Sequence, residues 1–343
     1  MNLKIVRIFA AHDLPNITEL LGRSEADLQQ EDIKIILNQS GEADLVLVLN
    51  TVRRPRWVRV PKGNLVKVLQ EPTVRNPITH LFTYWHSPVY DRILTHSPDV
   101  KDIRQIRSLP YLNSHVDPEL AIPKAETKQL QLSIIASTLA LSPGHKLRVS
   151  FVNSLLARIP DLKPHTFGKG RRQELTNKRD GLQNYRYSIA IENSCIQSYI
   201  TEKFYDCIIA GCIPLYYGAP DIDDYFPTDS YVPLPINDVE KCCQVISELS
   251  ESDYLRRLPA LIKARSLIRD NYSLGSLILN HFKLSEDRLI VKRRFALLFP
   301  LDALALFMWL SILHPIYHRL YRFYINVLRH VEVVHKKLRQ ITT

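Results

Sequence analysis

The segment from Tyr185 to Tyr231 carries the clearest structural signal in this sequence. Its apolar run at Tyr187–Ile191 is typical of a strand, and a polar loop follows it. Thr201 then has the character of an N-cap, and the helix it opens leads to a second apolar run at Ile213–Tyr217. Strand, helix and strand in this order predict a βαβ unit, in which the helix crosses between two parallel strands.

The same alternation of short apolar runs and polar segments extends through the rest of the chain, which predicts an α/β fold. The expected strands, besides the two above, are Lys4–Phe9, Ile33–Leu37, Leu45–Leu49, Leu65–Leu69, Arg92–Thr95 and Leu130–Ala136. A helix is expected at Lys146–Ile159.

The length of 343 residues favours two domains of about 100 to 200 residues each. Three prolines, Pro110, Pro118 and Pro123, mark a linker between them. We therefore expect two Rossmann-like lobes, residues 1–124 and 125–285, and a basic, aromatic, helical extension at 286–343.

Composition excludes several classes of protein. The 10 glycines and 21 prolines do not fit collagen-like or low-complexity chains. A net charge of +10 favours an anionic partner, namely a membrane surface, a phosphorylated small molecule or nucleic acid, but no nucleic-acid-binding motif is present. The five cysteines are odd in number and lack C-x-x-C spacing, so we expect neither a disulfide scaffold nor a zinc site, and a reducing compartment fits best.

Lys203 falls in the first turn of the helix that Thr201 caps. Free backbone N–H groups and the helix dipole favour an anion at this position, so a lysine there suggests a bound phosphate that neutralises it. A solvated lysine is the alternative. Half of the ten glycines lie between Gly168 and Gly218, which fits either a ligand-facing surface or ordinary turns.

The run IENSCIQSYITEKFYDCIIAGCIPLYYGAP, from Ile191 to Pro220, resembles the donor-binding signature of the α-1,3/α-1,4-fucosyltransferases, glycosyltransferase family 10, in its bacterial type. The family has F-E-N-S, then Y-[VI]-T-E-K, a helix and a-G-x-[IV]-P. This chain departs by placing Ile191 where the family usually has Phe. The resemblance implies a glycosyltransferase B-type fold, with an N-terminal acceptor lobe and a C-terminal lobe that binds GDP-fucose. It also implies inverting transfer of fucose to a glycan hydroxyl.

The resemblance also assigns roles to residues. It places Arg148 and Lys203 against the donor diphosphate, and Asn193 and Glu202 against ribose or sugar hydroxyls. Lys178, seven residues before Tyr185, resembles the approach to the signature. The donor-binding residues expected on this basis are Arg148, Lys178, Glu192, Asn193, Tyr199, Thr201, Glu202 and Lys203.

An inverting transfer also needs a carboxylate that takes the proton of the acceptor hydroxyl. In the family this glutamate follows a strand of the N-terminal lobe. The strand Leu65–Leu69 is followed by Gln70, Glu71 and Pro72, so Glu71 is the candidate base, with a surface glutamate before a proline turn as the alternative. No metal is expected, because two cations and a helix N-terminus suffice for the leaving diphosphate and the family needs none. The acidic residues Asp221, Asp223 and Asp224 are interpreted as loop carboxylates.

The C-terminal extension has a character of its own. Lys292, Arg293 and Arg294 precede an apolar stretch from Phe295 to Leu313, and apolar residues beyond Pro315 recur at helical spacing among basic ones. An interfacial helix pair on anionic lipid is the leading interpretation. The alternatives are a coiled-coil or oligomer contact and a packed core helix, whereas Asp302 argues against a membrane span.

The apolar stretch near the N-terminus is too short for a signal peptide. We therefore expect a cytoplasmic protein, peripheral to the inner face of the membrane, that uses a glycan or lipid-linked oligosaccharide acceptor. Two other functions stay open: the same fold with another GDP-linked hexose, and a non-catalytic membrane-associated scaffold.

Overall fold

A computed structural model describes residues 3–11, 14, 16–70, 89–96, 105–107, 114–119, 121–122, 124–140, 142–283 and 292–298. The strands are β1 Lys4–Ala10, β2 Ile33–Leu37, β3 Gly41–Glu42, β4 Leu45–Leu49, β5 Arg56–Pro61, β6 Leu65–Leu69, β7 Arg92–Thr95, β8 Gln105–Arg107, β9 Leu130–Ile135, β10 Thr166–Phe167, β11 Tyr185–Ile191, β12 Ile213–Tyr217, β13 Val232–Pro233 and β14 Arg293–Leu298. The helices are α1 Ile17–Leu21, α2 Glu25–Gln29, α4 Pro143–Arg158, α5 Glu202–Ile209, α6 Val239–Ser247, α7 Glu251–Leu267 and α8 Leu274–Lys283.

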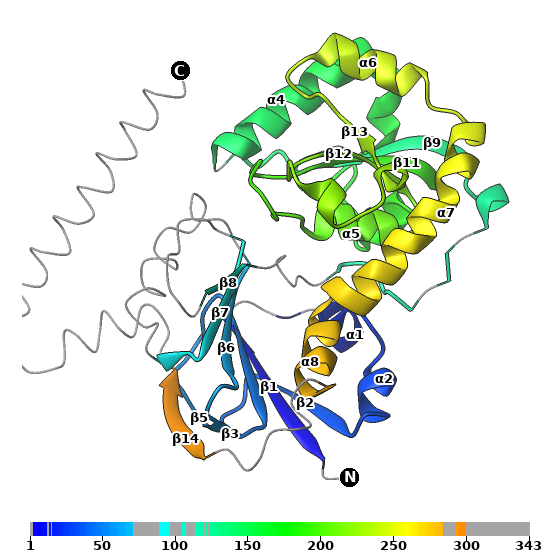
Figure 1. Ribbon diagram of the computed structural model, residues 1–343. Helices are drawn as coiled ribbons and strands as arrows, with labels where there is room; N and C mark the ends of the chain where they lie inside the picture. The colour runs from blue at the N-terminus through cyan, green and yellow to red at the C-terminus, as the bar shows by residue number, and fades with distance from the viewer. Residues whose placement is uncertain are drawn as a thin grey trace, which may run out of the picture.

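Two parallel sheets form the two lobes of Figure 1. The N-terminal sheet has the strand order β2-β1-β4-β6-β7-β8, and the C-terminal sheet has the order β10-β9-β11-β12-β13. Every neighbouring pair in both sheets is parallel. This confirms the expected α/β architecture with two Rossmann-like lobes, and the eight predicted strands are all present.

Side-chain caps explain where the helices of the C-terminal lobe begin. Ser142, Thr201, Asp238 and Ser250 each accept a hydrogen bond from a backbone N–H in the first turn of α4, α5, α6 and α7 respectively. The start of α5 after Thr201 is as predicted. Helix α4 begins at Pro143 rather than at Lys146, because Ser142 caps it and proline fits the first helical turn.

The core of the C-terminal lobe is large and includes Cys207 and Cys212, as expected for small buried side chains. All five cysteines are free. Burial raises the pKa of Cys212 to about 12, so its thiol stays protonated at neutral pH.

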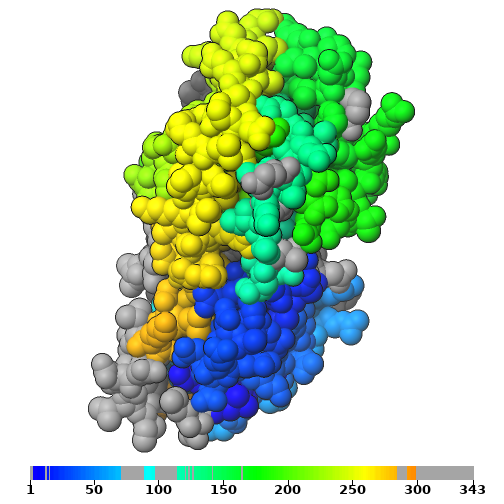
Figure 2. Space-filling model, turned by 90° about the vertical axis from the view of Figure 1, so that its right-hand side faces the viewer, coloured from blue at the N-terminus to red at the C-terminus, as the bar shows by residue number. Residues whose placement is uncertain are grey.

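The N-terminal lobe is completed by residues from the C-terminal half of the chain. Helix α8 buries Leu274, Ile278 and Phe282 against Val6 and Ile8 of β1. The sequence-based division at residue 285 therefore differs from the packing, because the apolar face of α8 covers the N-terminal sheet. Figure 2 shows α7 and α8 running from the upper lobe to the lower one.

Strand β14 also returns to the N-terminal lobe. It pairs antiparallel with β5, which in turn pairs with β3, to form a third sheet. These residues were expected in a helical extension, but the burial alternates along the strand: Ala296 and Leu298 are buried, whereas Phe295 and Leu297 are exposed. That period of two is the period of a strand. The rest of the predicted extension lies outside the described residues. Among the described residues, no helix is long and apolar enough to cross a membrane.

Candidate active site

The site is built around the point where the strand order of the C-terminal sheet reverses. From β9 the chain passes through α4 to β10 on one side, and then crosses to β11 on the other side of β9. In open α/β sheets, ligands bind at the carboxyl ends of the two strands that flank such a point. Here those strands are β9 and β11.

Arg148 of α4 bridges the ends of these two strands. Its Nη1 donates to Oδ1 of Asn193 at 2.7 Å, and its Nη2 donates to Oγ of Ser137 at 3.3 Å. Asn193 lies two residues after β11, and Ser137 two residues after β9. Arg148 is only 6% exposed, so the fold holds a buried guanidinium at the strand ends.

The first turn of α4 packs directly on the loop that follows β11. A Cβ on Gly144 would lie 1.9 Å from the backbone oxygen of Asn193, so only glycine fits at this helical position. The N-terminus of α4 therefore reaches the same loop that leads into α5. Two helix N-termini with their backbone N–H groups converge on one region, which is a favourable place for an anion.

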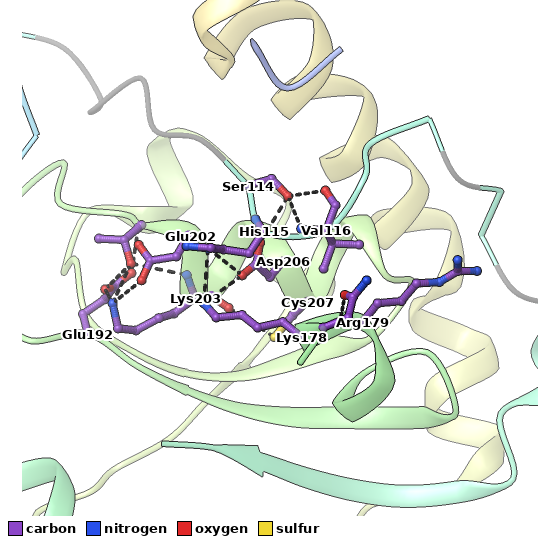
Figure 3. Close-up of polar contacts among 12 residues, drawn as sticks. Ser114, His115, Val116, Lys178, Arg179, Glu192, Glu202, Lys203, Asp206 and Cys207 are labelled. Atoms are coloured by element: carbon purple, nitrogen blue, oxygen red, sulfur yellow. Dashed lines mark hydrogen bonds and ion pairs between the residues drawn. The ribbon is translucent and has the colours of Figure 1, made fainter. Parts of the chain in front are cut away.

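Glu192 and Thr201 close the loop between β11 and α5. Oε1 of Glu192 accepts from the backbone N–H of Thr201 at 2.7 Å, and Oε2 accepts from the Thr201 hydroxyl at 2.6 Å. The Glu192 side chain is fully buried, with Lys203 Nζ at 3.5 Å as its ion-pair partner (Figure 3). Burial raises the pKa of Glu192 above its ordinary value even though Lys203 acts in the opposite direction. The main role of Glu192 is therefore structural, because its hydrogen bonds join the start of the loop to Thr201, the N-cap of α5.

Lys203 is held as a cation at the start of α5. Its Nζ lies 2.9 Å from Oε1 of Glu202 and donates to the Thr201 hydroxyl at 3.1 Å. Burial alone would lower the pKa of Lys203, but Glu202 and Glu192 raise it overall, so the ammonium stays charged at neutral pH. The positive charge of Arg148 acts on Lys203 in the opposite direction, which places the two cations in one electrostatic site.

Lys178 is tied to α5 one turn further along the helix. Its Nζ pairs with Oδ2 of Asp206 at 3.2 Å, and Oδ1 of Asp206 accepts from the backbone N–H of His115 at 2.7 Å and from the Ser114 hydroxyl at 3.1 Å (Figure 3). Lys178 also helps to lower the pKa of Glu202, against the effect of burial, so it belongs to the same field of charges. Asp206 was not among the predicted residues, although it lies four residues after Glu202 and therefore on the same helix face.

Tyr199 is buried and contacts the other lobe. Its ring centroid lies 5.0 Å from that of His96, the residue that follows β7. Both side chains are nearly inaccessible, at 2% and 1% exposure. The residue before it, Ser198, has φ of 61°, and its backbone N–H and hydroxyl both donate to Asp221. Asp221 thus anchors the loop at Ser198. No local sequence pattern predicts the contact between His96 and Tyr199.

The expected site residues of the C-terminal lobe fall into three connected groups. The first is Arg148 with Asn193, the second is Glu192, Thr201, Glu202 and Lys203, and the third is Lys178 on Asp206. Tyr199 lies within the loop and packs against His96. Glu71, the predicted base, lies outside the described residues. Within the described residues no three His, Cys, Asp or Glu side chains are grouped to hold a metal ion.

Comparison with known proteins finds a family match over most of the C-terminal lobe. Residues 126–256 match the family model described as glycosyltransferase family 10 (fucosyltransferase), C-terminal part. The chain is 33% identical to alpha-(1,3)-fucosyltransferase B of Drosophila melanogaster over 90 residues, which are 26% of this chain and 20% of that protein. It is 33% identical to GDP-fucose protein O-fucosyltransferase 3 of Homo sapiens over 81 residues, or 22% and 15% of the two chains. The matches thus cover a fifth or less of these relatives.

Among solved structures, an alpha1,3-fucosyltransferase with GDP-fucose superposes with a TM-score of 0.48 and 16% identity, over 84% of this chain and 92% of that one.

Proposed function

Since its residues 126–256 place this chain in glycosyltransferase family 10, the fucosyltransferases, we propose that it transfers fucose from GDP-fucose to a glycan hydroxyl with inversion at the anomeric carbon. The printed names of the relatives support the donor and the transferred sugar, because they include α-1,3-fucosyltransferases and a GDP-fucose protein O-fucosyltransferase.

The observation that carries the proposal is the pair of cations at the reversal point of the C-terminal sheet. Arg148 is anchored by Asn193 and Ser137, and Lys203 is anchored by Thr201. A guanidinium, an ammonium and two helix N-termini in one place suit the two phosphates of a nucleoside diphosphate. In the proposed complex the diphosphate takes over part of the neutralisation of Lys203 that Glu202 provides in the free protein.

The same groups suit the chemistry of the transfer. The bond between the anomeric carbon of fucose and the β-phosphate oxygen breaks, and the electron pair leaves with GDP. Fixed positive charges stabilise the negative charge that grows on the β-phosphate, and they need no rearrangement during the reaction. Arg148 and Lys203 would provide this stabilisation, so no metal is required by the proposal.

The acceptor half of the reaction needs a base on the opposite face of the sugar. The acceptor oxygen forms the new bond to the anomeric carbon and releases its proton to a carboxylate. Glu71 is the proposed base. Strand β6, which ends at Leu69 as predicted, brings the chain to the carboxyl edge of the N-terminal sheet just before this residue.

The proposal includes a location for the protein. We propose that it is a cytoplasmic, peripheral protein of the inner membrane face, with the residues after Leu298 on the lipid and a lipid-linked glycan as acceptor. The basic and aromatic composition of that segment supports this location.

Release of GDP tests the proposal. Purified protein is given GDP-fucose or other GDP-linked hexoses with membrane extracts as the acceptor source, and GDP release and sugar transfer are followed. We expect transfer from GDP-fucose and a loss of about 10²- to 10³-fold in Lys203→Ala. Lys241→Ala, on the exposed side of α6, should keep full activity.

Two results would redirect the proposal. Transfer from a different GDP-linked hexose would keep the site and change the sugar. No transfer and no binding of any GDP-sugar by the folded protein would favour the membrane-associated scaffold.

A further inference from the structure

The outer face of the β14-β5-β3 sheet carries a ridge of exposed apolar side chains. Trp57 of β5 is 45% exposed, and Phe295 and Leu297 of β14 are 63% and 50% exposed. Their neighbours Val58 and Ala296 point the other way and are buried. We call Trp57, Phe295 and Leu297 the outer ridge.

The ridge is a continuous structure rather than three scattered residues. Leu297 is the direct cross-strand partner of Trp57, and the rings of Trp57 and Phe295 stack with centroids 6.0 Å apart and planes within 15°. Of the large apolar side chains that are exposed in the described part of the chain, Trp57 and Phe295 are the aromatic ones, and they lie together. Such a patch marks an interaction surface more often than scattered exposed leucines do.

Positive charge surrounds the ridge. On the outer face, Arg59 is balanced by Glu42 at 2.8 Å and Arg293 by Asp44 at 2.6 Å. A surplus comes from Lys62 and Lys292, which are both exposed and adjacent, since the backbone N–H of Lys62 donates to the carbonyl of Lys292 at 3.2 Å. Exposed Arg54, just before β5, adds to it.

The position of the sheet in the fold suits a surface partner. Strands β14 and β5 lie at the end of the N-terminal lobe that faces away from the C-terminal lobe (Figure 1). A flat partner could therefore contact the ridge without approaching the site at β9 and β11. The chain leaves β14 at Leu298, and the sequence that follows is mostly apolar as far as Leu313, with Asp302 as its one charged residue.

We propose that the outer ridge docks on an anionic phospholipid surface, with Trp57, Phe295 and Leu297 at the level of the headgroups and Lys62 and Lys292 beside the phosphates. Tryptophan prefers the membrane interface, and aromatic side chains flanked by lysine and arginine are typical of interfacial binding to anionic lipid. The inference concerns the folded body of the protein and holds whichever sugar is transferred.

Fluorescence of Trp57 tests the contact directly. The chain has three tryptophans, so the full-length Trp85→Phe/Trp309→Phe protein reports on Trp57 alone. It is mixed with phosphatidylcholine vesicles that contain no anionic lipid or about 30% phosphatidylglycerol, with and without bromine on the acyl chains. We expect a blue shift and bromine quenching of Trp57 on the anionic vesicles, both reduced by high salt.

Substitution of the ridge gives the second measurement. Phe295→Ser/Leu297→Ser in the full chain should weaken the partition into anionic vesicles by at least about tenfold in a flotation assay, because two exposed apolar side chains lose their lipid contact. Leu255→Ser/Ile262→Ser is the matched control, because these α7 side chains are 46% and 48% exposed and lie outside the ridge. Equal thermal midpoints would show that both variants are folded.

Either of two results would overturn the inference. Vesicle binding without quenching of Trp57 would assign lipid contact to another segment. A blue-shifted, vesicle-independent Trp57 would show that the rest of the chain or a second copy covers the ridge.

Discussion

Lys128 shows how a single charged residue can hold a lobe together. Its side chain is fully buried, and its Nζ donates to the carbonyl oxygens of Leu182, Gln183, Tyr185 and Ala210. These carbonyls come from the turn before β11, from the first residue of β11 and from the C-cap of α5. Burial lowers the pKa of Lys128, with Cys212 and Cys207 acting against that effect. The lysine thus supplies donors to several buried backbone carbonyls, of which that of Leu182 also accepts from the backbone N–H of Tyr185.

We predict that Lys128→Met destabilises the C-terminal lobe by about 2 to 4 kcal/mol, because it leaves several buried carbonyls unsatisfied. The midpoint of urea unfolding, followed by tyrosine fluorescence, measures the effect. Lys241→Met removes an exposed lysine from α6 and should change the midpoint little. Similar midpoints for both variants would mean that water replaces the ammonium at no cost.

The lowered pKa of Asp206 makes the stability of the folded protein depend on pH. Burial alone would raise its pKa, but Lys178 and His115 lower it below the ordinary value. The folded protein therefore binds this proton less readily than the unfolded chain does. The ion pair stabilises the fold above about pH 4, and the contribution is lost as the pH falls below that value.

Thermal midpoints between pH 7 and pH 3 test this linkage. Wild type should lose stability more steeply than Asp206→Asn below about pH 4, since the variant no longer titrates at this position. Asp224→Asn removes an exposed carboxylate and should follow wild type. Parallel curves for wild type and Asp206→Asn would contradict the assigned ion pair.

Among the elements, the loop from Glu192 to Ile200 is held by contacts at its two ends and at Ser198. Asp221 accepts from the backbone N–H of Ser198 at 2.7 Å and from its hydroxyl at 3.2 Å. Because Ser198 has a left-handed backbone, this anchor fixes a conformation that the residue would seldom adopt alone. Asp221 therefore holds the loop in place.

We predict that Asp221→Ala weakens GDP binding by about five- to tenfold, because the loop must then be ordered on binding. Asp224→Ala is the matched control, since this carboxylate is exposed nearby. Calorimetry gives the affinity, and hydrogen exchange of residues 195–200 separates positioning from direct contact. Weaker binding with unchanged exchange would assign Asp221 to the ligand instead.

Sequence patterns predicted the elements of the two sheets well, because parallel strands are buried on both faces and show as apolar runs, such as Leu45–Leu49. They missed β5, whose residues alternate in exposure, as Trp57 and Val58 do. They also missed β14, where two arginines suggested a basic flank instead of a strand. The short strand β3 has only two residues and offers no pattern.

At the site, local spacing was enough for residues on one element. Thr201, Glu202 and Lys203 belong to one helix start and were all predicted. His115 and His96 were missed because they meet the site only through tertiary packing: His115 lies in the linker and His96 in the other lobe. Asp206 was missed although it lies on α5, one turn after Glu202. A signature motif identifies only the residues within it. It does not identify residues from other parts of the chain that pack against it.

For the whole molecule, α8 and β14 both pack on the N-terminal lobe. That lobe is therefore complete only when the chain extends to Leu298. Strand β14 covers β5 through the full run of pairs from Arg293 to Leu298. A deletion meant to remove the predicted extension must therefore start after Leu298, since one that starts at Arg288 also removes β14.

We predict that residues 1–298 fold with nearly the thermal midpoint of the full chain, whereas residues 1–283 melt several degrees lower or aggregate. The shorter chain exposes the edge of β5. It also loses the apolar contacts that Ala296 and Leu298 make with the core. Thermal unfolding of both truncations measures this. Equal midpoints would show that β14 adds nothing to the lobe.

The most direct test of the account is a calorimetric titration of GDP and of UDP into the wild-type protein and its Arg148→Met variant. We predict that GDP binds, that UDP binds far more weakly, and that Arg148→Met weakens GDP binding by about 10- to 100-fold, because the proposed complex places the diphosphate against this buried, anchored guanidinium. Equal GDP affinity in the folded variant, or no GDP binding by folded wild type, would contradict the assignment of the nucleotide to the reversal point between β9 and β11.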